Sequence, residues 1–124
     1  MLAYVALGGL AGTVARYALS GWLQLHVGRG DFPAGTLLVN VVGSLVLGFP
    51  LRYATGSTVF SPELRAGLTI GFCGAFTTMS TFGYESVVLL GDGQYSQAAV
   101  YIAVTMLGSI VAVMAGAAIA NQLL

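Results

Sequence analysis

Two runs of hydroxyl and amide side chains stand at helical spacing inside apolar stretches of this chain. They repeat every fourth residue: Thr36, Asn40 and Ser44 in one run, and Tyr101, Thr105 and Ser109 in the other. Side chains four residues apart share one face of a helix. Each run therefore offers a stripe of hydrogen-bond donors without formal charge. Such stripes either bond neighbouring helices together or line a path for an anion that is hydrogen-bonded and not ion-paired.

A third polar run is more unusual, because it interrupts a stretch that otherwise fits a membrane-spanning helix. Residues 71–82 read GFCGAFTTMSTF, with two glycines followed by four hydroxyl residues between Thr77 and Thr81. Bilayer lipid cannot satisfy free backbone groups, so a helix is broken at membrane depth only where protein or a wet cavity covers the break. Broken helices expose carbonyls and helix ends, which transport proteins use to hold ions. This run predicts a break in the helix and a site beside it.

Two charged residues also fall inside apolar stretches. Arg16 lies six residues before Trp22, and Glu85 follows the third polar run. An arginine within the membrane is a candidate functional residue, although its long side chain also reaches the interface easily. Arg16 either attracts an anion or extends to the interface. Glu85 lies at the mouth of a vestibule, pairs with an arginine or couples a proton.

Composition requires these residues to sit in lipid. The chain of 124 residues is 57% hydrophobic and only 6% charged, whereas soluble domains carry about 25% charged residues. A bilayer span needs about 20 mostly apolar residues. A single all-α membrane domain over residues 1–124 is therefore expected, crossing the bilayer with four helices, the third of them broken. The expected spans are 2–25, 34–54, 63–90 and 96–123.

The chain lacks the residues that enzymes and nucleic-acid-binding proteins need. The chain has one histidine, His26, and one cysteine, Cys73, so it offers neither a nucleophile–histidine–acid set nor a side-chain metal cluster. The net charge of zero gives no basis for binding nucleic acid. The sequence predicts a protein that is not an enzyme. Ser61, Pro62 and Glu63 predict the start of the third span, as an N-cap, a first-turn proline and a favourable acid.

Self-association follows from size and charge. Four short helices enclose little space, so a pore needs a second copy. Arg29 lies in the first connection, and Arg52 and Arg65 flank the second, so the positive charges bias the orientation only weakly, which favours an antiparallel dimer. Small residues four apart let helix backbones approach closely, either between copies or within one subunit. They include Gly8 with Gly12, Gly67 with Gly71, and a run of four from Gly108 to Ala120.

Three segments, in order, resemble the Fluc (CrcB) family of fluoride channels. They are GGLAGTVARY around Arg16, GTLLVNVVG around Asn40, and GFCGAFTTMSTF around the break. The resemblance covers essentially the whole chain. It implies an antiparallel dual-topology homodimer with two fluoride pores. It also implies a structural sodium ion at the dimer centre, held by backbone carbonyls of the broken third helix.

The resemblance also assigns roles by position. Gly74 and Thr77 would supply the sodium carbonyls, and Arg16 and Glu85 would be the first-helix arginine and the acid beyond the break. The pore-lining positions would be Asn40, Met79, Ser80, Thr81, Phe82, Tyr101, Thr105 and Ser109. The family logic is that amide and hydroxyl donors replace the water around fluoride, while electropositive ring edges of phenylalanine face the anion.

Met79 departs from the family pattern. The family reads Thr-Thr-Phe-Ser-Thr-Phe where this chain has Thr-Thr-Met-Ser-Thr-Phe. A thioether is polarizable but has no electropositive ring edge. The exchange predicts slower conduction, altered selectivity, or a compensating residue such as Phe76.

Two other functions fit part of the sequence. A small multidrug transporter has similar length and topology, but it needs an acid deep in the first span, where this chain has Arg16 and no acid. A membrane scaffold or assembly subunit would explain the small residues but not the donor stripes beside a broken helix.

Overall fold

The computed structural model describes residues 1–124 as helices joined by short connections, with no strand. Two long helices come first, α1 (Leu2–His26) and α2 (Ala34–Gly56), and α6 (Tyr95–Leu123) comes last. The third predicted span is divided into α3 (Pro62–Ala66), the π-helical segment η1 (Gly67–Cys73), α4 (Gly74–Phe76) and α5 (Met79–Gly91). The all-helical fold class is thereby confirmed.

The long helices agree closely with the expected spans. α1, α2 and α6 are each long and apolar enough to cross a bilayer. The third span is different because it is broken at Thr77 and Thr78, and its longest continuous α-helical piece, α5, has 13 residues. The break lies within the polar run that predicted it, whereas the π-helical turn before it has no signal in the sequence.

The start of the third span is built as predicted. Ser61 has extended backbone, and its hydroxyl accepts a hydrogen bond from the Leu64 amide at 3.2 Å. Pro62 occupies the first helical position, where a missing N–H costs nothing. This cap fixes where the chain re-enters the helical layer.

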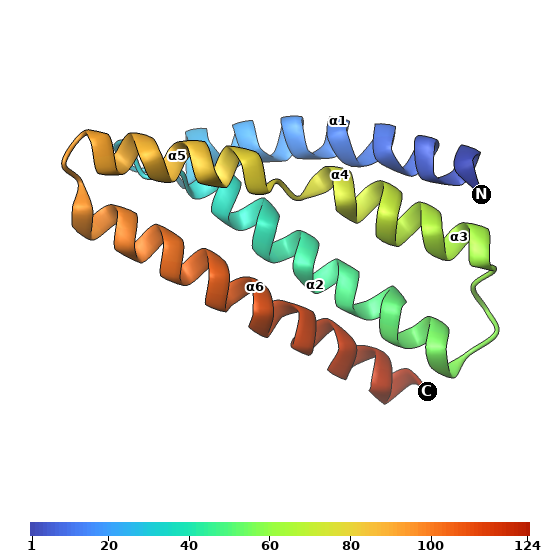
Figure 1. Cartoon of the computed structure of the whole chain (residues 1–124). Helices are drawn as coiled ribbons and strands as arrows, with labels where there is room; N and C mark the ends of the chain where they lie inside the picture. The colour runs from blue at the N-terminus through green and yellow to red at the C-terminus, as the bar shows by residue number, and fades with distance from the viewer.

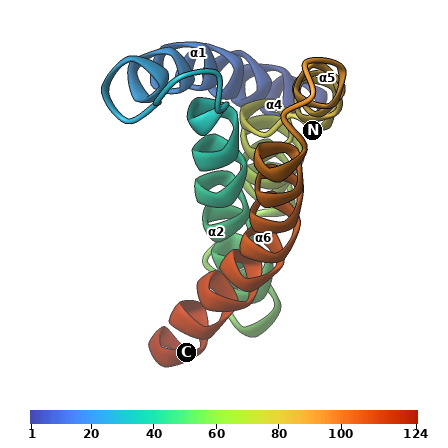
Figure 2. The same cartoon turned by 90° about the vertical axis from the view of Figure 1, so that its left-hand side faces the viewer.

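The helices form two crossing pairs. α1 packs along η1 and α4, and α2 packs along α6 (Figure 1). The end-on view shows α1 lying across the top of the α2 and α6 columns (Figure 2). α5 continues beyond the break over α6, so both halves of the third span lie beside α2 but against different partners.

Small residues make both crossings possible within one subunit. A Cβ at Gly8 or Gly12 of α1 would collide with the backbone of Gly67 or Phe72. At the second crossing, a Cβ at Gly116 would collide with the Leu45 backbone. The sequence left open whether these faces join helices or copies. In this structure the glycines bring helices of one subunit together.

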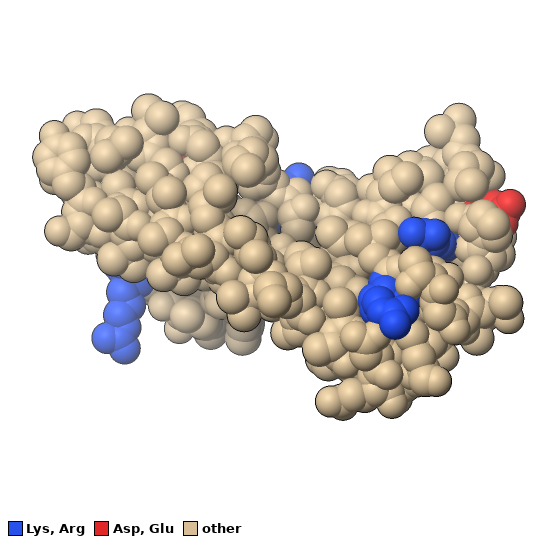
Figure 3. All heavy atoms as spheres, turned by 60° about the horizontal axis from the view of Figure 1, so that its bottom comes forward, with Lys and Arg blue, Asp and Glu red and all other residues tan.

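The surface is that of a membrane protein. Large apolar side chains point outward along every long helix, with Leu25 84% exposed and Leu107 65% exposed. Tan atoms cover most of the face in Figure 3, interrupted by a few separate blue groups and a red group at one edge; the blue groups are all arginines because the chain has no lysine. Contact with lipid satisfies such a surface, whereas water would not.

Candidate functional site

The site is organised by the break in the third span. Thr77 and Thr78 both have extended backbone, with φ and ψ of −88° and 159° for Thr77. Thr78 caps the helix that follows, because its hydroxyl accepts a hydrogen bond from the Thr81 amide at 3.3 Å. The chain thus ends one helix at Phe76 and begins another at Met79 without changing its general direction (Figure 1).

Asn40 holds the break open. Its Oδ1 accepts from the Thr78 amide at 2.7 Å, and its Nδ2 donates to the Thr78 carbonyl at 3.2 Å. The side chain is 8% exposed, so both bonds are protected from water. An asparagine amide is the smallest side chain that satisfies one backbone N–H and one C=O together. In this structure Asn40 therefore stabilises the non-helical backbone of Thr78.

This arrangement frees two backbone carbonyls. In a continuous helix the Thr78 amide would bond the Gly74 carbonyl, and the Thr81 amide would bond the Thr77 carbonyl. The Thr78 amide bonds Asn40 instead, and the Thr81 amide bonds the Thr78 hydroxyl. Gly74 is exposed on the subunit surface. These are the two carbonyls that the family resemblance assigns to a cation.

Arg16 reaches the same break from α1. Its Nε donates to the Ala75 carbonyl at 2.9 Å, in the last turn before the break. A helix C-terminus carries partial negative charge and unpaired carbonyls, and a guanidinium satisfies both. Arg16 therefore does not extend away to the interface in this structure.

A groove opens beside the break between α2, α5 and α6. Its volume is about 280 Å³. We call it the central groove, and its lining brings together five of the eight predicted pore residues, together with Thr77 of the predicted sodium site: Asn40, Met79, Phe82, Thr105 and Ser109. Met79 is 70% exposed at its edge, so the groove is open on one side of the subunit.

Thr105 has the most telling surroundings in the groove. The residue is 5% exposed, and its hydroxyl is the one buried side-chain polar atom without a hydrogen-bond partner. Leaving such a group unpaired costs about 1–3 kcal/mol. Ser44, on the facing helix, instead bonds the Asn40 carbonyl of its own helix at 2.7 Å. Of these two hydroxyls, the one on Thr105 has no protein partner.

A second, more polar hollow lies at the end of the molecule where α1 meets α2. Its volume is about 510 Å³, and we call it the end hollow. Thr36, Thr81 and Glu85 line it. The Thr36 hydroxyl donates to Glu85 Oε1 at 2.7 Å. Within this subunit Glu85 bonds the hydroxyls of Thr36 and Tyr101, and no arginine.

Tyr101 contacts residues of both hollows. Its hydroxyl donates to Glu85 Oε2 at 3.4 Å in the end hollow, and its ring lies 5.3 Å from the Phe82 ring, which lines the central groove. Tyr101 itself is fully buried. The Phe82–Tyr101 pair therefore stands where the two hollows approach each other.

The structure does not bring every predicted residue into these hollows. Ser80 is exposed and lines neither hollow. Arg16 bonds the Ala75 carbonyl from α1 and also lines neither hollow. Phe76, suggested as a substitute for the missing phenylalanine, is 4% exposed and stacks on Phe72, with ring centroids 5.5 Å apart. That suggestion is wrong for this subunit, because the ring is committed to packing between helices.

Sequence reasoning missed two residues near the end hollow. Gln24 of α1 donates to the Phe32 carbonyl at 3.0 Å and accepts from the Gly35 amide at 3.1 Å, so it caps the start of α2. Phe32 packs against Tyr101. Neither belongs to a polar stripe or a charged pair, and only the close approach of the connection to α6 reveals them.

Comparison with known proteins places these features in a family. Residues 3–117 match the family model described as CrcB-like protein, Camphor Resistance (CrcB). The fluoride-specific ion channel FluC of Geobacter metallireducens is 50% identical over 103 residues, which cover 83% of this chain and 82% of that protein. The FluC of Geobacter sulfurreducens is 44% identical over 119 residues, covering 96% and 95%. That of Geotalea daltonii is 42% identical over 120 residues, covering 97% and 96%.

Proposed function

This chain belongs to the CrcB family, and on that premise we propose that it is a passive, fluoride-selective channel that lets cytoplasmic fluoride leave the cell. It is a multi-pass integral membrane protein, in bacteria of the inner membrane, and it is not an enzyme. Fluoride export by this route would lower the toxicity of the ion.

The unpartnered hydroxyl of Thr105 is the observation that carries the proposal. A buried donor without a protein partner is expensive unless a ligand uses it. Thr105 lies in the central groove with Phe82 and Ser109, beside the helix break. A hydroxyl, a second hydroxyl and a ring edge suit a small anion, because each offers positive charge density without a full charge.

The chemistry of fluoride fits this lining. Fluoride is small and holds water tightly, so a selective path must replace the water with close donors. Neutral donors bind weakly enough to release the ion, as conduction requires. We place the path along the α6 stripe, from Tyr101 through Thr105 to Ser109, facing Met79 and Phe82 of α5.

We further propose that a structural sodium ion is held by the Gly74 and Thr77 carbonyls. Both lack their helical donors, because Asn40 and the Thr78 hydroxyl have bonded those amides. Carbonyl oxygens suit a hard cation. Two carbonyls are too few for such an ion, so the same pair from a second copy would complete the cage.

The open side of the central groove supports an antiparallel homodimer. Hydroxyl groups facing lipid would lack partners, Met79 is exposed at the edge of the groove, and Gly74 is exposed on the subunit surface. A second copy facing the groove would shield these groups and close the path. The weak arginine bias allows the two copies to insert in opposite directions.

The first experiment is fluoride efflux from liposomes that contain the purified protein, followed with a fluoride electrode and repeated with chloride. Wild-type protein should release fluoride and retain chloride. Thr105→Val removes the hydroxyl and keeps the shape, so it should slow fluoride efflux by roughly tenfold, the equivalent of one lost hydrogen bond. Thr69→Val is the control, because the Thr69 hydroxyl bonds the Arg65 carbonyl one turn earlier in the third span and the residue lines no part of the central groove.

Thermal unfolding of the same variants sharpens the test. Since the Thr105 hydroxyl has no partner, Thr105→Val should unfold at the same temperature as wild type or higher. A fall in both efflux and stability would contradict the assignment of the hydroxyl to the ion. No fluoride efflux from a folded wild-type dimer would overturn the channel proposal and favour a scaffold. A multidrug transporter remains disfavoured, because α1 contains no acid.

A further inference from the structure

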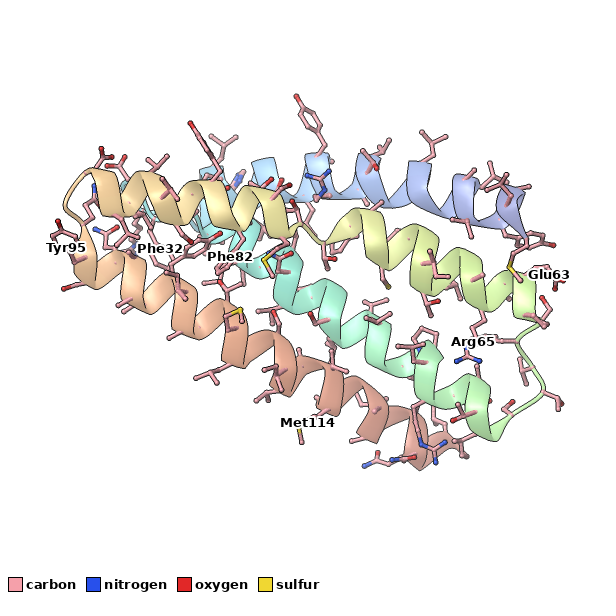
Figure 4. All side chains as sticks on the ribbon, viewed as in Figure 1. Phe32, Glu63, Arg65, Phe82, Tyr95 and Met114 are labelled. Atoms are coloured by element: carbon pink, nitrogen blue, oxygen red, sulfur yellow. The ribbon has the colours of Figure 1, made fainter.

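The connection between α1 and α2 sends one aromatic side chain toward the proposed ion path. The ring of Phe32 meets the ring of Tyr101 edge to face, with centroids 5.7 Å apart and planes at 83°. Phe32 lies near Tyr95 at one end of the molecule, Phe82 lies further toward the middle, and Arg65 lies toward the other end (Figure 4). A residue of a connection between helices thus touches a residue of the α6 stripe.

The backbone of Phe32 is held firmly for a connection of this kind. Gln24 donates to its carbonyl at 3.0 Å, and the Ala34 amide donates to the same oxygen at 2.9 Å. The neighbouring Asp31 accepts a hydrogen bond from Gln94 at 3.1 Å, which ties this connection to the one before α6. The ring is therefore presented to Tyr101 from a fixed support.

Tyr101 is held between two phenylalanine rings. The Phe32 ring meets the Tyr101 ring edge to face. The centroid of the Phe82 ring lies 5.3 Å from that of Tyr101, with the two planes inclined at 46°. Leu89 and Ala98 complete the buried cluster around it. The Tyr101 hydroxyl bonds Glu85 at 3.4 Å, near the long limit for a hydrogen bond. A bond this long depends closely on where the ring is held.

We infer that Phe32 is a positioning residue for the ion path: it fixes the Tyr101 ring, and through that ring the hydroxyl that faces Glu85. The inference rests on the proposed function, since it deepens the role of the α6 stripe. The connection before α2 is then part of the conduction machinery, although it lines no part of the central groove.

A role as simple apolar filling would give a different result. Filling predicts that any apolar side chain of similar size serves, and that losses appear in stability alone. Positioning predicts a loss of conduction that disappears when the Tyr101 hydroxyl is absent. The chain offers a matched control in Phe60, a connection phenylalanine whose ring lies 5.7 Å from that of Tyr53 at the other end of α2.

The experiment compares Phe32→Leu, Phe32→Tyr and Phe60→Leu in the liposome efflux assay. Phe32→Leu should slow fluoride efflux roughly two- to tenfold, the value of one aromatic pair. Phe32→Tyr keeps the ring and should restore the rate, and Phe60→Leu should leave it unchanged. In a Tyr101→Phe background, Phe32→Leu should cause no further loss. An equal loss in both backgrounds, or unchanged efflux in Phe32→Leu alone, would overturn the inference.

A second measurement tests the inference without ion transport. In protein labelled with 3-fluorotyrosine, the Tyr101 signal is the ¹⁹F resonance that vanishes in Tyr101→Phe. This resonance should shift or change width in Phe32→Leu and stay unchanged in Phe60→Leu. An unmoved resonance would overturn the positioning role. Wild-type protein that passes no fluoride would overturn the proposed function instead, while the resonance still decides the placement of Tyr101.

Discussion

The two halves of the third span differ in how they are held. The half before the break, from Pro62 to Phe76, packs on α1 with backbone against backbone. A Cβ at Gly71 would lie 2.5 Å from the Val5 carbonyl oxygen, and Gly8 approaches Gly67 as closely. The half after the break, α5, has open space around Gly83 and is tied to its neighbours by side-chain hydrogen bonds.

This difference separates support from function. Steric fit holds the first half at Gly67 and Gly71, where the α1 backbone leaves no room for an added methyl group. Hydrogen bonds and ring contacts hold the second half, and the same side chains line the hollows. The break between them, fixed by Asn40, lets one span be rigid on one side and chemically active on the other.

The largest expected effect tests the half of the third span before the break. Gly71→Ala places a methyl group against the α1 backbone and should destabilise the protein by about 1–3 kcal/mol or more. Gly83→Ala places the same group in open space and should be neutral, or stabilising by about 0.5–1 kcal/mol. Thermal unfolding and the yield of monodisperse protein measure both. Equal stability of the two variants would contradict the comparison.

The second largest effect tests the break between the two halves, which Asn40 stabilises. Asn40→Ala leaves the Thr78 amide and carbonyl without partners and should cost about 1–3 kcal/mol. Ser44→Ala, one turn later, removes only a bond within its own helix and should cost clearly less. Sodium should raise the unfolding temperature of wild type. It should lose that effect in Asn40→Ala, because the Thr78 amide is then free to bond Gly74; a retained sodium effect would argue against the role of Asn40.

A smaller effect tests the attachment of the break to α1. Arg16→Gln removes the Nε donor to Ala75 and should reduce stability by about 1.5 kcal/mol at most, because the bond is only partly buried. Arg52→Gln is the control, because its exposed bond to Thr55 contributes little. Chemical denaturation of both variants gives the difference. If Arg52→Gln proves as costly, the bond to Ala75 has no special importance.

The smallest effect tests the half after the break, α5. Met79 is 70% exposed at the edge of the central groove, so a phenylalanine fits there without displacing packed atoms. Met79→Phe restores an electropositive ring edge and should keep or raise fluoride efflux. A large drop in efflux with intact folding would show that the thioether itself is needed.

The sequence predicted where the third span begins and where it breaks. It did not predict which side chains meet around the break. The cap at Ser61 and the helix boundaries follow from local chemistry, and the structure agrees with them. The π-helical turn has no local signal. Phe76 was misplaced because its exposure depends on which helix lies opposite, and Phe32 was missed because its partner is 69 residues away in sequence.

The sequence alone determined that the chain lies in lipid and that it folds into helices. An apolar chain with four arginines and four acids must lie in lipid, and lipid forces its backbone into helices wherever protein does not cover a break. Tertiary structure decided which donors remain free. Thr36, Asn40 and Ser44 looked equivalent in sequence, yet they bond Glu85, Thr78 and their own helix, while Thr105 bonds nothing. A hydrogen bond depends on which groups meet in space, and residue spacing along one helix cannot specify that.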